Sequence, residues 1–190
     1  LTAIYGWKPG AALPVSGINE DDYKMATQII LWEYQQQLRS DPYSRHGNGH
    51  ADGDQYFSVI AGRPAEKASD WILAQVASHS TVPSFTSSKK SEAPELELKW
   101  DVEKKVYTLT VTDTNNLKID LEALKGSGVS VTRNGNEYTF TSRQMMMDPV
   151  LFEFRKNIPV ANDMLIWGRP GYQTMMTGAS DPVSFFVKIK

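Results

Sequence analysis

The sequence predicts an α+β fold with a β-sandwich or barrel core and a helical subdomain inserted near the N-terminus. Apolar residues recur at helical spacing between about residues 18 and 80, and they alternate at strand spacing over much of residues 95–190. A Ser-, Thr-, Lys- and Pro-rich stretch, residues 81–94, separates the two patterns. The length of 190 residues is usual for one domain, so we expect a single domain over residues 1–190.

Two helices are expected in the helical part. Asn19 or Asp21 is suited to cap the first helix, which should end before Pro42. Its apolar face consists of residues at helical spacing: Tyr23, Ala26, Ile30, Tyr34 and Leu38. The second helix is expected over residues 65–80. Residues 41–62 are rich in Gly, Asn, Asp and His, so we expect a long loop between the helices.

Short strands are expected in the β-rich part. The alternation and the apolar runs place them at residues 95–100, 106–112, 117–121, 129–132, 137–141, 150–158, 164–167, 172–177 and 183–189. Asn134-Gly135 is a strong signal for a two-residue hairpin. The apolar run at residues 1–7 is also expected to be a strand, which would join the termini in the β core.

Composition excludes several classes of function. The formal net charge of −2 and the scattered lysines give no electrostatic basis for binding nucleic acid or an anionic membrane. A membrane-spanning helix needs about 20 apolar residues in succession, and the sequence has no such run. The absence of cysteine excludes disulfides, thiolate metal sites and a cysteine nucleophile in this chain.

Patterns for metal binding and hydrolysis are weak. Asn48, His50, Asp52 and Asp54 alternate as in a calcium loop, but the twelfth position is Val59 rather than Glu. His46 and His50 have the i,i+4 spacing of ligands on a helix, which the neighbouring glycines oppose. No G-x-S-x-G motif is present. We therefore expect no metal, no cofactor and no enzymatic activity, with a hydrolase using this loop as a distant alternative.

Three separated motifs carry a family resemblance. They are the aromatic-Gly-apolar run Tyr5-Gly6-Trp7, the T-Q-x-x-apolar-W motif of Thr27, Gln28 and Trp32, and the apolar-Q-x-x-apolar motif that begins at Tyr172 and Gln173. In this order, and with the Gly178–Val183 run before the last strand, they resemble the thioester domains of Gram-positive surface adhesins. The resemblance spans nearly the whole chain, although each motif alone is weak.

The resemblance implies roles for these residues. In that family a cysteine sulfur is acylated by the side chain of a distant glutamine, and a lysine amine of a target displaces the thiolate. Gln173 stands where the family has the acyl-donor glutamine, and Gly6 stands where it has the cysteine. An alternative alignment places the cysteine position at Ala3. Five further residues would then support the site without reacting: Thr27, Gln28, Trp32, Tyr5 and Tyr172.

The resemblance implies an extracellular adhesin domain at the bacterial cell wall surface, a monomer within a larger multidomain chain. Its partner would be a lysine amine on a host surface or matrix protein. Without cysteine, this chain is expected to be a non-reactive variant, whether natural or made by replacing the cysteine. The alternative is a non-covalent binding or spacer module, in which Gln173 is an ordinary strand residue and Gly6 is a native glycine at a kink or bulge.

Overall fold

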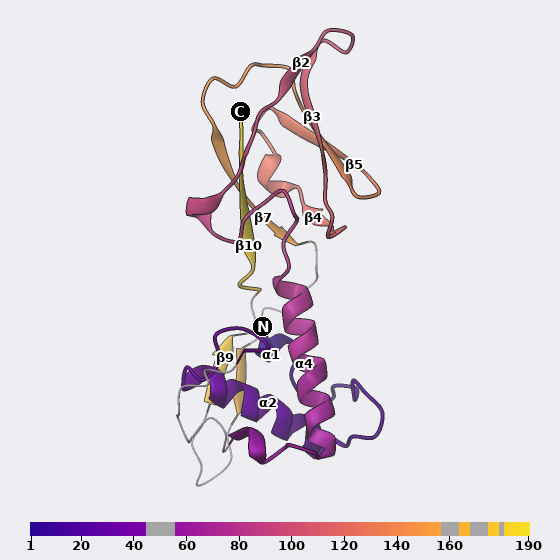
Figure 1. Cartoon of the computed structure of the whole chain (residues 1–190), viewed down its shortest axis with the longest axis vertical. Coiled ribbons are helices and arrows are strands. Elements are labelled where there is room, and N and C mark those ends of the chain that lie inside the picture. Colours follow the sequence, from indigo (N-terminus) through magenta and orange to yellow (C-terminus); the bar gives the residue numbers. More distant parts are fainter. Residues whose placement is uncertain (45–55, 157–163, 168–174, 179–180) are drawn as a thin grey trace. The chain divides into compact units, whose positions relative to one another are not determined.

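A computed structural model describes residues 1–44, 56–156, 164–167, 175–178 and 181–190 (Figure 1). The chain is an α+β protein, as the sequence predicts. It divides into two compact units. One unit, the helical unit, comprises Leu1–Ser80 and Val160–Asp181, and the other, the sandwich unit, comprises Thr81–Pro159 and Pro182–Lys190.

Helices α1 (Thr2–Tyr5), α2 (Glu20–Gln35) and α4 (Pro64–Ser80) form the described core of the helical unit. Asn19 begins α2 with a capping box, because its side chain accepts from the Asp22 N–H while the Asp22 carboxylate accepts from the Asn19 N–H, both at 2.9 Å. Apolar residues of α2 and α4 pack on one another: Tyr23, Ala26 and Ile30 against Ala68, Ile72, Leu73 and Val76.

The expectation of a strand at residues 1–7 is wrong, because residues 2–5 form α1. The N–H groups of Ile4 and Tyr5 donate to the Leu1 carbonyl, and that of Gly6 donates to the Thr2 carbonyl. Leu1 and Tyr5, four residues apart, pack against the α2 and α4 cluster. A short apolar run does not distinguish a strand from a single helical turn, and here burial against two helices favours the turn.

Two four-stranded sheets make the sandwich unit. One has the order β1 (Glu95–Leu96), β10 (Ser184–Ile189), β7 (Val150–Lys156) and β4 (Ile119–Asp120). The other has the order β2 (Lys99–Asp101), β3 (Val106–Thr112), β6 (Glu137–Ser142) and β5 (Val129–Asn134). Short 3-10 helices, η1 (Lys90–Glu92) and η2 (Glu122–Leu124), lie in the connections.

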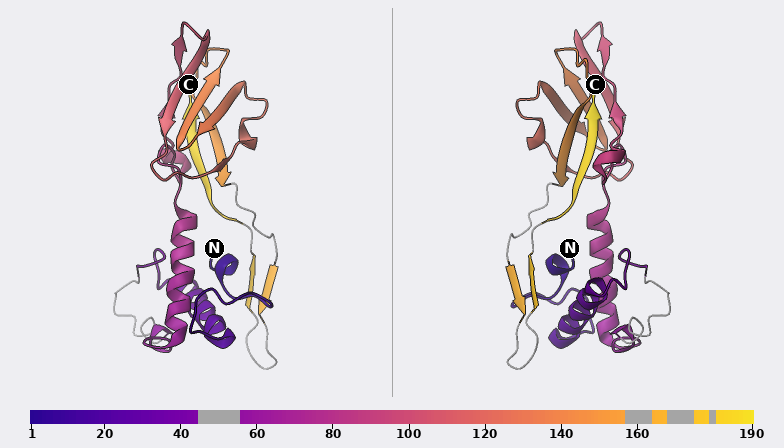
Figure 2. Two further views of the ribbon diagram at one scale, coloured as in Figure 1. Left: turned by 90° about the vertical axis from the view of Figure 1, so that its right-hand side faces the viewer. Right: turned by 90° about the vertical axis from the view of Figure 1, so that its left-hand side faces the viewer.

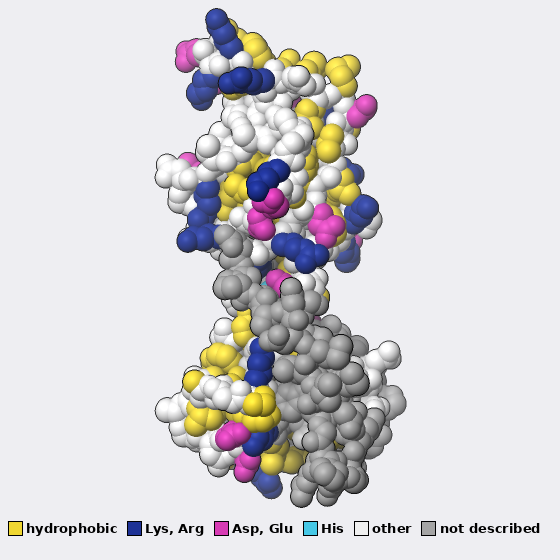
Figure 3. Space-filling view, turned by 180° about the vertical axis from the view of Figure 1, so that it is seen from behind, with side chains coloured by type: hydrophobic (Ala, Val, Ile, Leu, Met, Phe, Trp, Pro, Cys, Tyr) yellow, Lys and Arg dark blue, Asp and Glu magenta, His cyan; other side chains and the backbone are white. Residues whose placement is uncertain are grey.

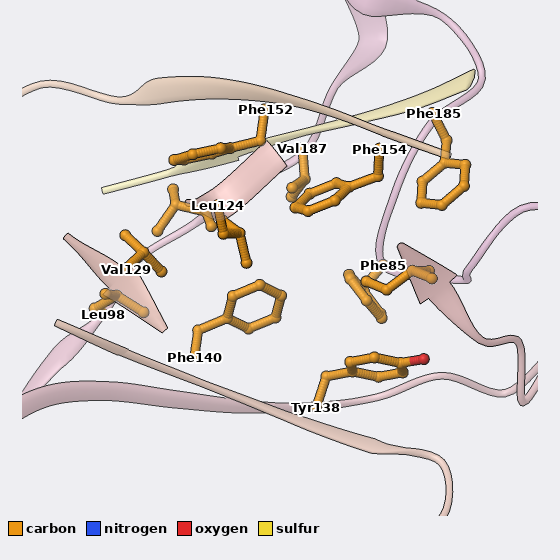
Figure 4. Packing of buried hydrophobic residues seen from close by; sticks show 12 residues of the cluster. Phe85, Leu98, Leu124, Val129, Tyr138, Phe140, Phe152, Phe154, Phe185 and Val187 are labelled. Atoms are coloured by element: carbon orange, nitrogen blue, oxygen red, sulfur yellow. The ribbon is translucent and has the colours of Figure 1, made fainter. Parts of the chain in front are cut away.

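Aromatic residues from both sheets fill the core of the sandwich unit. Phe152, Phe154 and Phe185 face inward from β7 and β10, while Tyr138 and Phe140 face inward from β6 (Figure 4). The inward positions of β10 are every second residue, and all three are fully buried: Phe185, Val187 and Ile189. This alternation is the two-residue period of a strand with one buried face.

The sequence predicts one strand over residues 95–100, but the structure has two. Residues 95–96 pair with β10 in a parallel direction, and residues 99–101 pair with β3 in the other sheet. The Leu98 N–H donates to the Lys190 carbonyl at the crossing. Leu96 and Leu98 pack in the core while Glu95, Glu97 and Lys99 are exposed, so one face stays buried across the change of sheet and period-2 alternation alone does not reveal it.

Residues 160–181 do not belong to the sandwich unit, although the sequence assigns them to the β-rich part. They contain β8 (Met164–Trp167) and β9 (Met175–Gly178), which pair antiparallel with Leu165 opposite Thr177 (Figure 2). This hairpin therefore comes late in the sequence but groups with the N-terminal helices.

Charged side chains of both signs are interspersed over the face of the sandwich unit in Figure 3. Over the whole sequence, 20 Lys and Arg residues nearly balance 22 Asp and Glu residues, which gives the formal net charge of −2. Among the helices that the structure describes, none combines the length and apolar character needed to cross a membrane.

Candidate functional site

Helix α1 and its C-cap residue Gly6 carry the two positions that the resemblance offers for a cysteine, and α1 lies against α2 and α4 (Figure 2). Ala3 is 4% exposed, and Gly6, the residue that caps α1, is also buried. The two positions are three residues apart, so they lie on the same side of this helical turn. A cysteine at either position would therefore be buried near the same part of the helical unit.

Gly6 has no room for a side chain. A Cβ atom at this position would lie 2.3 Å from Cγ2 of Thr27 and 2.7 Å from the carbonyl oxygen of Thr2. Thr27 cannot turn aside freely, because its hydroxyl donates to the Tyr23 carbonyl at 2.8 Å and accepts from the Trp7 N–H at 2.9 Å. Between the two candidate positions, the packing therefore favours Ala3, where a Cβ atom is already accommodated.

The members of the T-Q-x-x-apolar-W motif lie in different environments. Thr27 is fully buried and contacts Gly6 and Trp7 as described above. Gln28 is exposed on α2. Trp32 packs on the ring of Tyr56 with a centroid distance of 5.5 Å, in a separate cluster with Ile29 and Ile60. Among the described contacts, Thr27 is the motif residue that joins α2 to the Tyr5-Gly6-Trp7 segment.

A chain of polar contacts connects α1 to the end of α4 and to the segment after β9. The Tyr5 hydroxyl lies 2.5 Å from Nδ1 of His79, and Nε2 of His79 lies 3.0 Å from Oδ1 of Asp181. The His79 side chain is fully buried and that of Asp181 is 12% exposed. In the tautomer with its proton on Nε2, Nδ1 accepts from the Tyr5 hydroxyl and the Nε2–H group lies beside the carboxylate.

Two tyrosines of this region have raised pKa values. Burial raises the pKa of Tyr5, and the negative charge of Asp181 raises it further. Burial also raises the pKa of Tyr23, whose hydroxyl donates to the Tyr5 carbonyl at 2.5 Å. Both phenols are therefore held as neutral hydrogen-bond donors, a state that fixes α1 in place rather than one that makes a nucleophile.

The sequence missed His79 and Asp181, although it held a signal for each. His79 follows Ile72 and Val76 on the buried face of α4, and a polar residue on a buried face needs a partner. Asp181 belongs to the Gly178–Val183 run that carries part of the resemblance. The sequence could not show that these two residues meet Tyr5, because 74 positions separate Tyr5 from His79.

Some predicted site residues lie outside the described residues. These are Tyr172 and Gln173, together with the loop residues His46, Asn48, His50, Asp52 and Asp54. Their predicted roles stay predictions. Within the described ranges, no group of three or more His, Asp or Glu side chains is placed to hold a metal ion.

Comparison with known proteins gives one similar structure. No protein-family model matches the chain, and no curated protein matches it. The chain is similar to the solved thioester domain of the Staphylococcus aureus TIE protein, with 18% sequence identity and a TM-score of 0.43. The match covers 92% of this chain and 63% of the other, so this chain spans less than two thirds of that structure.

Proposed function

We propose that this chain is a thioester-type adhesin domain in which the cysteine position is Ala3 and the reactive sulfur is absent. The observation that supports this most is the contact of two motifs across 20 positions, since Thr27 both bonds to the Trp7 N–H and packs on Gly6. In this proposal Thr27 keeps α1 in place, and Ala3 marks the buried position from which a sulfur would reach Gln173.

The chemistry of the reactive form is an acyl transfer in two steps. First, the cysteine sulfur forms a bond to the side-chain carbonyl carbon of Gln173, the carbon–nitrogen bond breaks, and the thiol proton leaves with ammonia. Second, a lysine amine forms an amide with the same carbon, the carbon–sulfur bond breaks, and the thiolate takes a proton from the amine. A buried position limits the water that competes with the amine.

The biological setting belongs to the same proposal. The target would be a lysine amine on a host surface or matrix protein, and the domain would act as a monomer within a larger surface chain at the bacterial cell wall. As written, the chain lacks the nucleophile and would bind such a target without a covalent bond.

Restoring the sulfur tests the proposal. The variant Ala3→Cys should fold and lose the mass of one ammonia, and incubation with methylamine should then add the mass of one methylamine and release a thiol that iodoacetamide modifies. Gly6→Cys is the matched variant, which the contact with Thr27 should prevent from forming the bond. Ala3→Ser controls for a polar group at the same position.

Each outcome separates the alternatives. Ammonia loss in Gly6→Cys but not in Ala3→Cys would overturn the choice of position and keep the family assignment. A folded Ala3→Cys and a folded Gly6→Cys that both retain the full mass would favour a non-covalent binding or spacer module. A stoichiometric methylamine adduct on the unmodified chain would contradict its inactivity.

A further inference from the structure

The contacts among Asp181, His79 and Tyr5 join three separate segments of the helical unit. Tyr5 lies on α1 two positions after Ala3, His79 lies in the last turn of α4, and Asp181 follows β9 by three positions. The same β9 follows Gln173 by two positions in the sequence. These contacts therefore join the helical turn that carries Ala3 to the end of α4 and to the residue that follows β9 by three positions.

We propose that Asp181, His79 and Tyr5 form a positioning clamp that fixes the helical turn bearing Ala3 to the end of α4 and to the segment after β9, and that this constraint supports acyl transfer from position 3. This inference rests on the proposed function. A bond between two side chains that are distant in sequence needs their reacting atoms near contact distance, and small displacements reduce such rates strongly. The clamp supplies that constraint through the hydrogen bond between Tyr5 and His79 and through the close polar contact between His79 and Asp181.

The buried imidazole explains why the clamp is specific. A fully buried polar ring is costly unless both nitrogens have partners, and the Tyr5 hydroxyl and the Asp181 carboxylate lie at those nitrogens. The Tyr5 and His79 rings also meet edge to face, with centroids 5.5 Å apart. Rotation of the His79 ring would lose both polar contacts together, so α1 and the Asp181 segment are fixed to the same side chain.

The kinetic test uses Ala3→Cys as the background. The protein is synthesised in a cell-free system, translation is stopped, and ammonia loss is followed by intact mass. Adding Tyr5→Phe or Asp181→Asn should slow ammonia loss by roughly ten- to a hundredfold. Tyr138→Phe is the matched control, because Tyr138 also donates its hydroxyl in a partly buried bond, to the Leu117 carbonyl, but lies in the sandwich unit.

Two replacements of His79 separate positioning from loss of bulk. His79→Asn places a polar atom near the site of Nδ1 and keeps a partner for Tyr5, whereas His79→Gln places one near Nε2 and keeps a partner for Asp181. Each preserves half of the clamp, so both should fold and neither should restore the rate of ammonia loss. A normal rate in either variant, or in Tyr5→Phe, would overturn the clamp.

A second readout does not depend on the sulfur. In the unmodified chain with ¹⁵N-labelled histidine, Tyr5→Phe should shift the Nδ1 resonance of His79 and Asp181→Asn should shift the Nε2 resonance. Both variants should speed amide hydrogen exchange in α1 relative to Tyr138→Phe. If Ala3→Cys never loses ammonia, the proposed function fails, and faster exchange in α1 still supports the clamp. Unchanged resonances and unchanged exchange would reject it.

Discussion

At the residue scale, Thr27 is the best-defined link between the motifs. Its hydroxyl both donates to the Tyr23 carbonyl and accepts from the Trp7 N–H, and its methyl group occupies the space beside Gly6. The Thr27 side chain therefore accounts for the glycine at the end of α1, because no larger residue fits beside its methyl group. Its hydroxyl also fixes the direction of the chain after Gly6 through the bond to the Trp7 N–H.

Gly6→Ala should destabilise the protein by about 1–3 kcal/mol, because the added methyl group overlaps the Thr27 methyl and the Thr2 carbonyl. Urea unfolding monitored by far-ultraviolet circular dichroism measures the change. The double variant Gly6→Ala with Thr27→Ser keeps the hydroxyl and removes the methyl, so it should recover part of the loss relative to Thr27→Ser alone. Equal losses in the two backgrounds would show that the Thr27 methyl is not the obstacle.

Asp113 organises the loops of the sandwich unit. Its fully buried carboxylate accepts from three backbone N–H groups, those of Ser84 at 2.8 Å, Asn115 at 3.1 Å and Leu117 at 2.7 Å. Asp113→Ala leaves these donors without their acceptor and should cost about 3 kcal/mol. Asp113→Asn keeps one carbonyl oxygen and should cost less. Thermal unfolding of the two variants shows which loses more stability. An equal loss in both would argue against the three hydrogen bonds to the Asp113 carboxylate.

At the scale of the element, the turn that ends α2 places Gln37 in the left-handed backbone conformation, which residues other than glycine seldom adopt. Gln37 has φ of 57°, while the Gln37 N–H donates to the Tyr34 carbonyl and the Leu38 N–H donates to the Glu33 carbonyl. This is the Schellman pattern, in which glycine is the usual residue at the left-handed position. The helix therefore ends at Gln35, well before Pro42, because of this turn rather than the proline.

Gln37→Gly should stabilise the protein by about 0.5–1 kcal/mol, since glycine adopts the left-handed region without steric cost. Gln36→Gly is the matched control. Gln36 has φ of −84°, so glycine there removes no strain and should reduce stability through the entropy of the unfolded chain. The two midpoints of urea unfolding should move in opposite directions, and a shared direction would contradict the assigned conformation.

The elements also show the limit of periodicity. The cap of α2 and the strand β10 were readable from neighbouring residues, because caps and strand propensity are local properties. The helical state of α1 and the division of residues 95–101 between two sheets were not readable, because both depend on the surfaces that these short segments meet.

At the scale of the whole molecule, each unit has its own buried cluster. The α2 and α4 residues form one, and the inward faces of the two sheets form the other. Both contain tyrosines whose pKa values are raised chiefly by burial: Tyr5, Tyr23 and Tyr34 in the helical unit and Tyr138 in the sandwich unit.

Stability should therefore decline at alkaline pH. A phenol whose pKa is higher in the folded than in the unfolded state contributes stability that is fully present below the unfolded value, near 10.0, and is lost as the pH rises through the folded value. Urea unfolding at pH 8 and at pH 10.5 should show the loss, and Tyr23→Phe should reduce it. Ultraviolet absorbance should show that these phenols ionise at a higher pH than the exposed tyrosines. Ionisation of all tyrosines together near pH 10 would contradict their burial.

The sequence alone predicted the α+β class, the start of α2, the extent of α4 and most strands, and it contains the motifs that carry the family resemblance. These follow from periodicity, caps and turn residues, which are properties of neighbouring positions. The packing of distant segments shows that residues 2–5 are helical, that residues 160–181 group with the helices, and that Gly6 has no room for a side chain. It also brought His79 and Asp181 to Tyr5, because such contacts depend on the packing of segments distant in sequence.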